Sequence, residues 1–139
     1  MEIRQFQETD RAGVLSVWVN SGITRPWNNP DKDIDRKVAV DPNGFLVALQ
    51  DSVLVGTVMA GYDGHRGWIQ YMAVDPGAQR GGIGRALMDA AVGLLRERGC
   101  PKINLQVRRD NEAVVDFYTT LGFVEDDVLS MGFRLEADE

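Results

Sequence analysis

The chain has 139 residues, of which 44% are hydrophobic, so it can bury one core but is too short for two ordinary domains. Its 15 Lys and Arg residues against 21 Asp and Glu residues give a net charge of −6, which repels nucleic acid phosphates. No signal peptide and no apolar run of the roughly 20 residues that span a bilayer is present. We therefore expect one cytoplasmic domain over residues 1–139, with no nucleic acid, membrane or metal partner.

The first half of the chain predicts a strand, two helices and then three antiparallel strands. Asn29 can cap the second helix, and Pro30 suits its first helical position. Short β-branched runs on either side of a tight connection indicate a hairpin, and a third strand follows it. The expected strands are residues 3–6, 45–49, 53–59 and 68–74, and the expected helices lie between residues 10 and 21 and after Pro30.

The second half predicts a strand-helix-strand unit, another helix and two short final strands. Apolar residues recur at helical spacing from Gly82 to Arg98, and residues 103–107 alternate as a strand. Strands joined through a helix must pair in parallel. A helix ending at Gly122 and two strands within residues 123–135 complete the chain. The order of elements predicts an α+β fold with a mixed sheet.

A glycine-rich turn separates the strand that ends at Asp75-Pro76 from the helix that begins at Gly82. The first amides of a helix lack intrahelical partners, and the helix dipole is positive there, so this turn can bind a phosphate. Glycine at positions 82 and 84 would let a pyrophosphate approach the backbone, and Arg80 and Arg85 would add positive charge. The alternative is a tight turn with no ligand. A dinucleotide-binding fold fits less well, since Leu87 replaces its third glycine.

Two motifs together resemble those of the GCN5-related N-acetyltransferases. The first is Gln79-Arg80-Gly81-Gly82-Ile83-Gly84 after Val74-Asp75-Pro76, and the second joins Asn111 and Tyr118 to Gly122-Phe123. Two further segments, Arg25-Pro26-Trp27-Asn28 and residues 61–67, are similar to a little-characterised bacterial branch of that family. The resemblance implies a single-domain fold with about four helices and a mixed central sheet of six to seven strands, splayed in the middle.

The resemblance also implies a function and a site. Acetyl-coenzyme A would donate an acetyl group to a primary amine of a small molecule or protein, by direct attack in a ternary complex. Tyr118 would reach the thioester sulfur and protonate the leaving thiolate, since a phenol of pKa near 10 can do so. The expected cofactor-binding residues are Met72, Ala73, Val74, Gln79, Arg80, Gly81, Gly82, Ile83, Gly84, Arg85 and Asn111.

The general base and the acceptor site stay open. Gln70 and Gln106 stand on the central strands where several relatives carry a glutamate, which favours a water relay or an amine that is already neutral. Loop residues His65, Asp63 and Asp31 are the other candidates for the base. Four aromatic residues could line the acceptor pocket or belong to the core, namely Trp27, Tyr62, Trp68 and Tyr71. The missing carboxylates also leave open a non-catalytic acyl-coenzyme A sensor, and the sequence does not decide whether the chain forms a homodimer.

Overall fold

A single mixed sheet forms the centre of the molecule, in a computed structural model that describes residues 1–78 and 81–138. The strands follow the order β1-β2-β3-β4-β5, and neighbours are antiparallel except for the parallel pair β4 and β5. This mixed sheet is the one that the strand-helix-strand pattern predicts. The strands are β1 (Glu2–Gln5), β2 (Phe45–Gln50), β3 (Val53–Tyr62), β4 (Gly67–Val74) and β5 (Ile103–Leu105).

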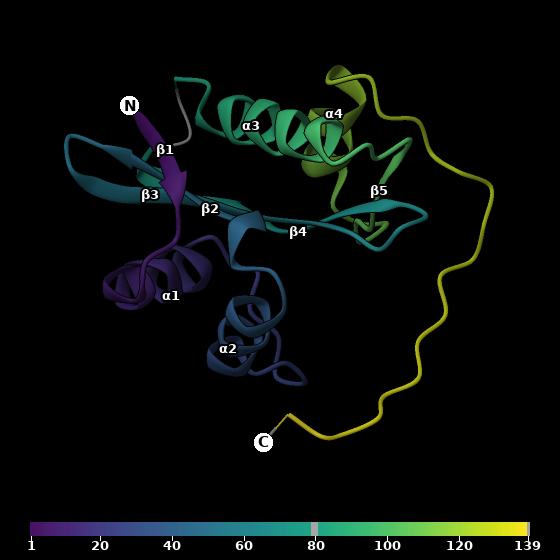
Figure 1. Cartoon of the computed structure of the whole chain (residues 1–139), viewed down its shortest axis with the longest axis horizontal. Coiled ribbons are helices and arrows are strands. Elements are labelled where there is room, and N and C mark those ends of the chain that lie inside the picture. Colours follow the sequence, from purple (N-terminus) through teal and green to yellow (C-terminus); the bar gives the residue numbers. More distant parts are fainter. Residues whose placement is uncertain (79–80, 139) are drawn as a thin grey trace.

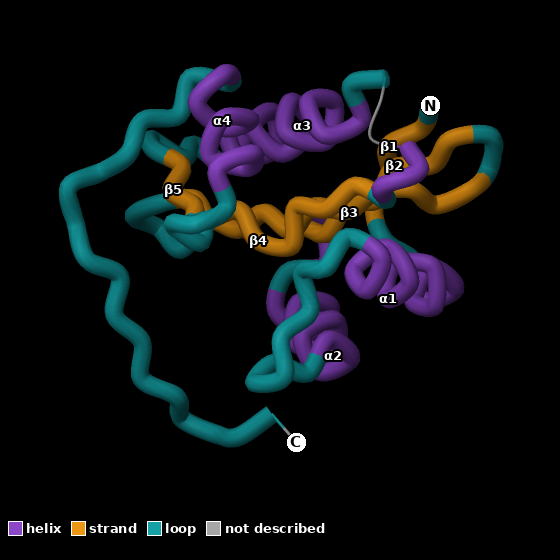
Figure 2. The backbone as a smooth tube through the Cα atoms, turned by 180° about the vertical axis from the view of Figure 1, so that it is seen from behind, coloured by secondary structure: helices purple, strands orange, loops and turns teal. Residues whose placement is uncertain are grey.

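Helices cover both faces of this sheet (Figure 1), and Figure 2 shows the same layers from behind. α1 and α2 pack on one face around Trp18 and Phe45, while α3 and α4 pack on the other around Leu87 and Tyr118. Within the described residues, no helix is both long and apolar enough to cross a membrane. The helices are α1 (Arg11–Asn20), α2 (Pro30–Val40), α3 (Ile83–Glu97) and α4 (Glu112–Thr120), with short 3-10 helices at Glu8–Asp10, Pro42–Gly44 and Pro76–Ala78.

Local signals place these elements as the sequence predicts. The Asn29 side chain accepts a hydrogen bond from the Lys32 amide at 3.2 Å, which caps α2 ahead of Pro30. Asp51 and Ser52 both have positive φ, at 51° and 66°, as a tight hairpin turn requires. Gly56 lets α3 approach β3 closely, because a Cβ there would lie 2.9 Å from Leu87 Cδ1. The helix that carries the phosphate-binding turn is thus pressed onto the sheet.

The sheet opens between β4 and β5. Only residues 67–69 of β4 pair with β5, so residues 70–74 run on without that neighbour. β4 also carries an irregularity against β3, between the pairs Met59↔Gln70 and Thr57↔Ala73. The sheet is therefore splayed where the resemblance implies, next to the chain that leads into α3.

The expected number of six to seven strands is wrong, because the sheet has five. Residues 123–135 form no strand, although Leu129, Met131, Phe133 and Leu135 alternate with polar residues. These four side chains are 87–91% exposed, and the segment runs outside β5 toward α2 (Figure 1). Side chains hold parts of it, as in the 3.0 Å ion pair of Lys102 with Asp126. Alternation predicts an extended chain, but a strand also needs a backbone partner, and the pattern does not supply one.

A polar cluster, formed by Lys37, Asp41 and Arg98, joins the two helical layers beside the sheet. The Arg98 guanidinium, just after α3, donates two hydrogen bonds to the Asp41 carboxylate, at 2.8 and 3.0 Å. Lys37 of α2 donates to the Ala60 carbonyl of β3 at 2.6 Å and lies 3.2 Å from Asp41. Arg98 thereby lowers the pKa of Asp41, with a further contribution from Lys37.

Candidate active site

The N-terminus of α3 has the features of an anion site. Gly82 is its N-cap, in a left-handed conformation with φ of 74°, and has no side chain with which to cap the helix. The Ala86 amide makes a 3.0 Å bond to the Gly82 carbonyl, so the preceding amides, of residues 83–85, have no intrahelical partner. No acidic residue lies in the first turn, and Arg85 is exposed there. Gln79 and Arg80 lie outside the described residues.

The glycines of this turn have two different roles. A Cβ at Gly81 or Gly82 would meet no atom of the described residues within 4 Å, which leaves room for a ligand beside them. At Gly84, however, a Cβ would lie 3.2 Å from both Met72 Cε and Phe117 Cζ. Gly84 therefore permits close packing between helices and sheet, and its expected role in binding the pyrophosphate stays a prediction.

These contacts bring three predicted parts of the site together. Met72 comes from the splayed end of β4, Gly84 from the first turn of α3, and Phe117 from α4. Phe117 also lies edge-on to Tyr118, with ring centroids 5.1 Å apart. A ligand that starts at the N-terminus of α3 can thus follow β4 toward Tyr118. The two motifs, which are 27 residues apart at their nearest ends, Gly84 and Asn111, meet at this junction through Gly84 and Phe117.

Tyr118 is 7% exposed, and its ring packs between Phe117 and Phe123. Its hydroxyl makes no hydrogen bond with any residue that the structure describes. In the same part of the chain no buried side-chain oxygen or nitrogen lacks a partner, so this hydroxyl must reach accessible space. Burial raises the pKa of the Tyr118 phenol to about 12. The phenol is therefore protonated at neutral pH and has no hydrogen-bond partner among the described residues.

Asn111 caps α4. Its Oδ1 accepts a bond from the Val114 amide at 3.4 Å, which leaves its amide NH₂ for a ligand. Met72 and Ala73 lie in the part of β4 that β5 does not pair with, and they pack into opposite cores. Of the predicted cofactor residues, Met72 and Gly84 are in contact at the junction, and Asn111 lies at the start of the helix that carries Phe117.

The two glutamines that replace a strand carboxylate, and the loop residues that are candidates for the base, lie in different parts of the structure. Gln70 is exposed on β4, and Gln106 follows β5 and donates a hydrogen bond to the Ser130 hydroxyl. Asp63 forms the β3–β4 turn, where it accepts bonds from the amides of His65 and Arg66, both at 2.8 Å. These two bonds are the main cause that lowers the pKa of Asp63. Asp63 thus has a turn-forming role.

The four candidate acceptor aromatics do not form one pocket. Tyr62 and Trp68 belong to the β3–β4 turn, where their polar atoms bond to the Gly64 carbonyl and to Asp63. Trp27 is 50% exposed, and Arg108 lies over its ring, 5.1 Å from the centroid. That pair joins the α1–α2 connection to the segment after β5, near the splay.

Tyr71 packs on the face of the sheet that α1 and α2 cover, and the sequence did not predict its hydrogen-bond partner. Its hydroxyl donates a 2.5 Å hydrogen bond to Asp33 of α2, and its ring stacks on Trp18. Burial is the main cause that raises the pKa of Tyr71, and Asp33 adds to it. Asp33 carries no motif, so only the fold reveals this contact. Asp31, two residues earlier, instead pairs with Arg11 at 3.2 Å on the surface.

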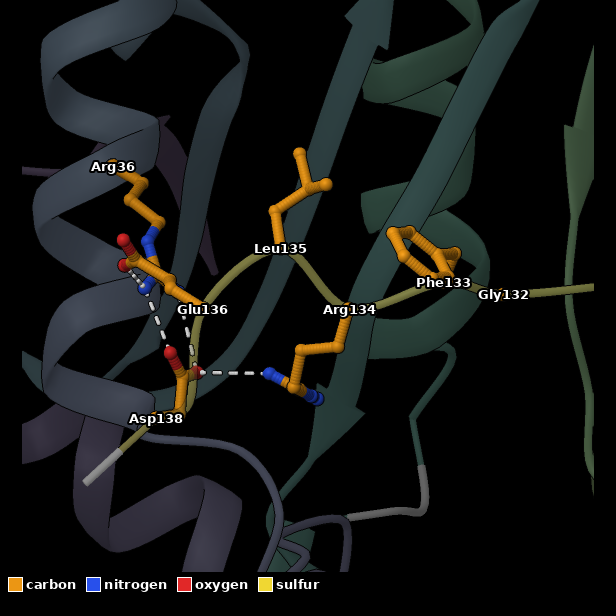
Figure 3. A pocket seen from close by; sticks show the side chains of 7 residues that line it. All are labelled: Arg36, Gly132, Phe133, Arg134, Leu135, Glu136 and Asp138. Atoms are coloured by element: carbon orange, nitrogen blue, oxygen red, sulfur yellow. Dashed lines mark hydrogen bonds and ion pairs between the residues drawn. The ribbon is translucent and has the colours of Figure 1, made fainter.

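A hollow of about 850 Å³ lies elsewhere, between α2 and the C-terminal segment (Figure 3). Arg36, residues 132–136 and Asp138 line it. Its charges are satisfied, since Arg36 bonds to Glu136 at 2.8 Å and to Asp138 at 2.7 Å. Arg36 lowers the pKa of Asp138, and the Asn29 amide contributes. None of the described residues at the α3–β4 junction lines this hollow, so it is not the candidate site.

Comparisons with known proteins agree with this geometry. Residues 4–123 match the family model described as the Acetyltransferase (GNAT) family. An acetyltransferase of Yersinia enterocolitica is 44% identical over 139 residues, which are 100% of this chain and 99% of that protein. The fold is similar to PaiA N-acetyltransferase from Thermoplasma acidophilum, solved with coenzyme A, at a TM-score of 0.80 and 23% identity over 91% of each chain.

A second solved structure, Ard1 from Thermoplasma volcanium, has a TM-score of 0.75 and 30% identity, covering 88% of this chain and 82% of that one. The resemblance that the two sequence motifs indicated is thereby confirmed, as are the acetyltransferase activity and the acetyl donor that it implied. The chain belongs to the GNAT family, as an acetyltransferase that uses acetyl-coenzyme A.

Proposed function

We propose that this protein is a cytoplasmic N-acetyltransferase, one domain over residues 1–139, that transfers the acetyl group to a primary amine in a ternary complex. One observation carries the proposal. The uncapped N-terminus of α3 and the splayed part of β4 meet where Gly84 packs against Met72 and Phe117, and the Tyr118 ring lies edge-on to Phe117. An anion site and a stretch of β4 that β5 does not pair with thus lie next to the helix that carries the Tyr118 hydroxyl.

The cofactor would lie along this path. Its pyrophosphate binds the amides of residues 81–85, with Arg85 and the undescribed Gln79 and Arg80 beside it. Its pantetheine arm follows residues 72–74, where β5 gives no pairing, and meets the free amide group of Asn111. Coenzyme A in the Thermoplasma acidophilum relative supports the assignment of that ligand to this fold.

The reaction requires the neutral amine to attack the thioester carbonyl, which forms a tetrahedral oxyanion and then releases a thiolate. A backbone N–H in the splayed part of β4 binds the oxyanion. Tyr118 donates a hydrogen bond to the departing sulfur. Its pKa of about 12 lies above the roughly 8.5 of a thiol, so full proton transfer would be uphill by about 5 kcal/mol. Tyr118 therefore stabilises the developing negative charge, and the proton lost by the amine neutralises the thiolate.

The decisive experiment is a panel of primary amines with acetyl-coenzyme A, in which release of free thiol is followed. The panel should contain small metabolite amines and peptides with free N-termini or lysines. Amine-dependent release supports the proposal. A thermal shift with acetyl-coenzyme A, but no release with any amine, would instead support the acyl-coenzyme A sensor that the missing strand carboxylates raise.

His65 is expected to leave the pH dependence unchanged. It lies seven residues before Met72, which is about 23 Å at the rise of an extended strand, so it cannot reach an amine at the splay without rearrangement. The rising limb of kcat/KM against pH should follow the pKa of the acceptor amine or of a water chain. We expect acceptors of lower pKa to move that limb downward, in the wild type and in His65→Ala alike.

One result would contradict the expectation that His65 is not the base. A limb that stays near pH 6.5 with every acceptor and disappears in His65→Ala would identify histidine as the base.

At alkaline pH, kcat is expected to stay constant up to about pH 10. Tyr118 acts in its protonated form, and burial raises its pKa to about 12, so ionisation of this group begins later than for an ordinary tyrosine. Acceptors with an amine pKa below 8 keep the rising limb out of this range. A fall in kcat centred near pH 10, absent from Tyr118→Phe, would contradict the raised pKa.

A further inference from the structure

The irregularity in β4 is a β-bulge centred on Tyr71. The register pairs Met59 with Gln70 and Thr57 with Ala73, so Tyr71 and Met72 together stand opposite Val58. Two residues against one define a bulge, which bends the strand and redirects its backbone groups. The bulge begins two residues after Ile69, where pairing with β5 ends. It therefore determines how the backbone leaves the sheet at the candidate site.

Tyr71 has a backbone conformation that a bulky residue adopts rarely. Its φ is 50°, in the left-handed region, where glycine or asparagine is usual. Such a conformation persists only where surrounding contacts impose it. Tyr71 and Met72 also pack into opposite cores, toward α1 and α2 and toward α3 and α4 respectively. Tyr71 can thus act on the cofactor side only through the backbone.

Three contacts impose this conformation. The Tyr71 ring stacks on Trp18, with centroids 3.9 Å apart and planes 19° from parallel. The Tyr71 carbonyl accepts a 2.8 Å bond from the Thr57 hydroxyl, which itself accepts a 2.9 Å bond from the Trp18 indole. The Tyr71 hydroxyl donates the 2.5 Å bond to Asp33. Trp18 and Thr57 are 0% exposed, so the ring and the carbonyl are held by rigid neighbours.

We infer that Tyr71 is a positioning residue, which, supported by Trp18, Thr57 and Asp33, aims the Met72 amide at the oxyanion of the acyl transfer. The catalytic part of this inference rests on the proposed function. An oxyanion donor is effective only when its direction is set before the reaction, and a displacement of about 1 Å can lower the rate by as much as 10²-fold. Asp33, on α2, thereby acts on a reaction that takes place on the opposite face of the sheet.

The test removes the Asp33 contact and retains the ring. Tyr71→Phe is expected to lower kcat about tenfold with KM for acetyl-coenzyme A unchanged, because the bulge loosens while the cofactor site at α3 is intact. Asp33→Ala should give the same loss, and the double variant no more than either. Asp33→Asn keeps an acceptor oxygen for the hydroxyl and should restore most of the rate. Tyr62→Phe is the matched control, since among the described residues its hydroxyl bonds only to the exposed Gly64 carbonyl.

Nitrogen-15 correlation spectra separate this inference from the proposed function. In Tyr71→Phe and Asp33→Ala, the amide signals of residues 70–73 should move or broaden, and in Asp33→Asn and Tyr62→Phe they should not. This measurement needs no acceptor amine, so it tests the positioning role of Tyr71 even if no amine is acetylated. Unmoved amide signals, or wild-type kcat in Tyr71→Phe, would overturn the inference. Loss of rate that only follows loss of thermal stability, without rescue by Asp33→Asn, would equally assign Tyr71 a purely structural role.

Discussion

Tyr118→Phe is expected to lower kcat by about 10²-fold or more while acetyl-coenzyme A binds as before. The substitution deletes only the hydroxyl, which has no partner among the described residues, so no hydrogen bond within the protein is lost. The ring contacts to Phe117 and Phe123 persist, and the fold should keep its stability. Steady-state kinetics with an amine found in the panel, together with the thermal shift by acetyl-coenzyme A, measures both parts.

The changes in kcat and KM should show what the Tyr118 hydroxyl does. If Tyr118 stabilises the developing thiolate, kcat and kcat/KM fall together, because the contact forms in the transition state. A rise in KM alone would indicate that the hydroxyl only binds the cofactor. Wild-type turnover in Tyr118→Phe would show that Tyr118 has only a packing role in the hydrophobic core.

Gly82→Val is expected to abolish the stabilisation by acetyl-coenzyme A, which for the wild type should be about 2.7 kcal/mol at 100 times the dissociation constant. A valine at a φ of 74° is strained, and its side chain would occupy the space above the helix amides where we propose that the pyrophosphate binds. Thermal unfolding with and without the cofactor measures this, and circular dichroism checks that the fold is retained.

Gly99→Val is the matched control. Gly99 has a φ of 80° and open space around it, as Gly82 does, but it follows the C-terminal end of α3. Both variants should lose similar stability from backbone strain, and only Gly82→Val should lose the shift. Gly84→Val is a poorer test, since its side chain would collide with Met72 and Phe117 and disturb the packing. A normal shift in Gly82→Val would refute the phosphate assignment.

Local signals predicted most of the fold. The cap at Asn29, the hairpin turn at Asp51 and Ser52 and the apolar spacing of residues 83–97 all depend on neighbours in sequence, and each element lies where these signals place it. The predicted number of strands was wrong because strand pairing joins segments that lie far apart in the sequence. Leu129 to Leu135 alternate as a strand does, but alternation does not identify an edge that will accept the segment.

In the candidate site, the turn at Gly82 carries a physical signal, whereas the roles expected of Asn111 and Tyr118 come from the family resemblance. The contacts that hold Tyr71 in its left-handed conformation were not predictable from the sequence. Asp33, Trp18 and Tyr71 are far apart in sequence, and a left-handed tyrosine follows from the bulge register rather than from its neighbours. Contacts of this kind depend on tertiary structure alone.

The polar cluster of Lys37, Asp41 and Arg98 has a consequence for how the molecule unfolds. Asp41 follows α2 and Arg98 follows α3, so the paired carboxylate and guanidinium fasten helices from opposite faces of the sheet to each other. Lys37 ties the same cluster to the backbone of β3. If either layer detached, the Arg98–Asp41 pair would break, so that Arg98 would lose this carboxylate while Asp41 would keep its contact with Lys37. The α1–α2 layer and the α3–α4 layer should therefore open as one cooperative unit, rather than as two independent flaps.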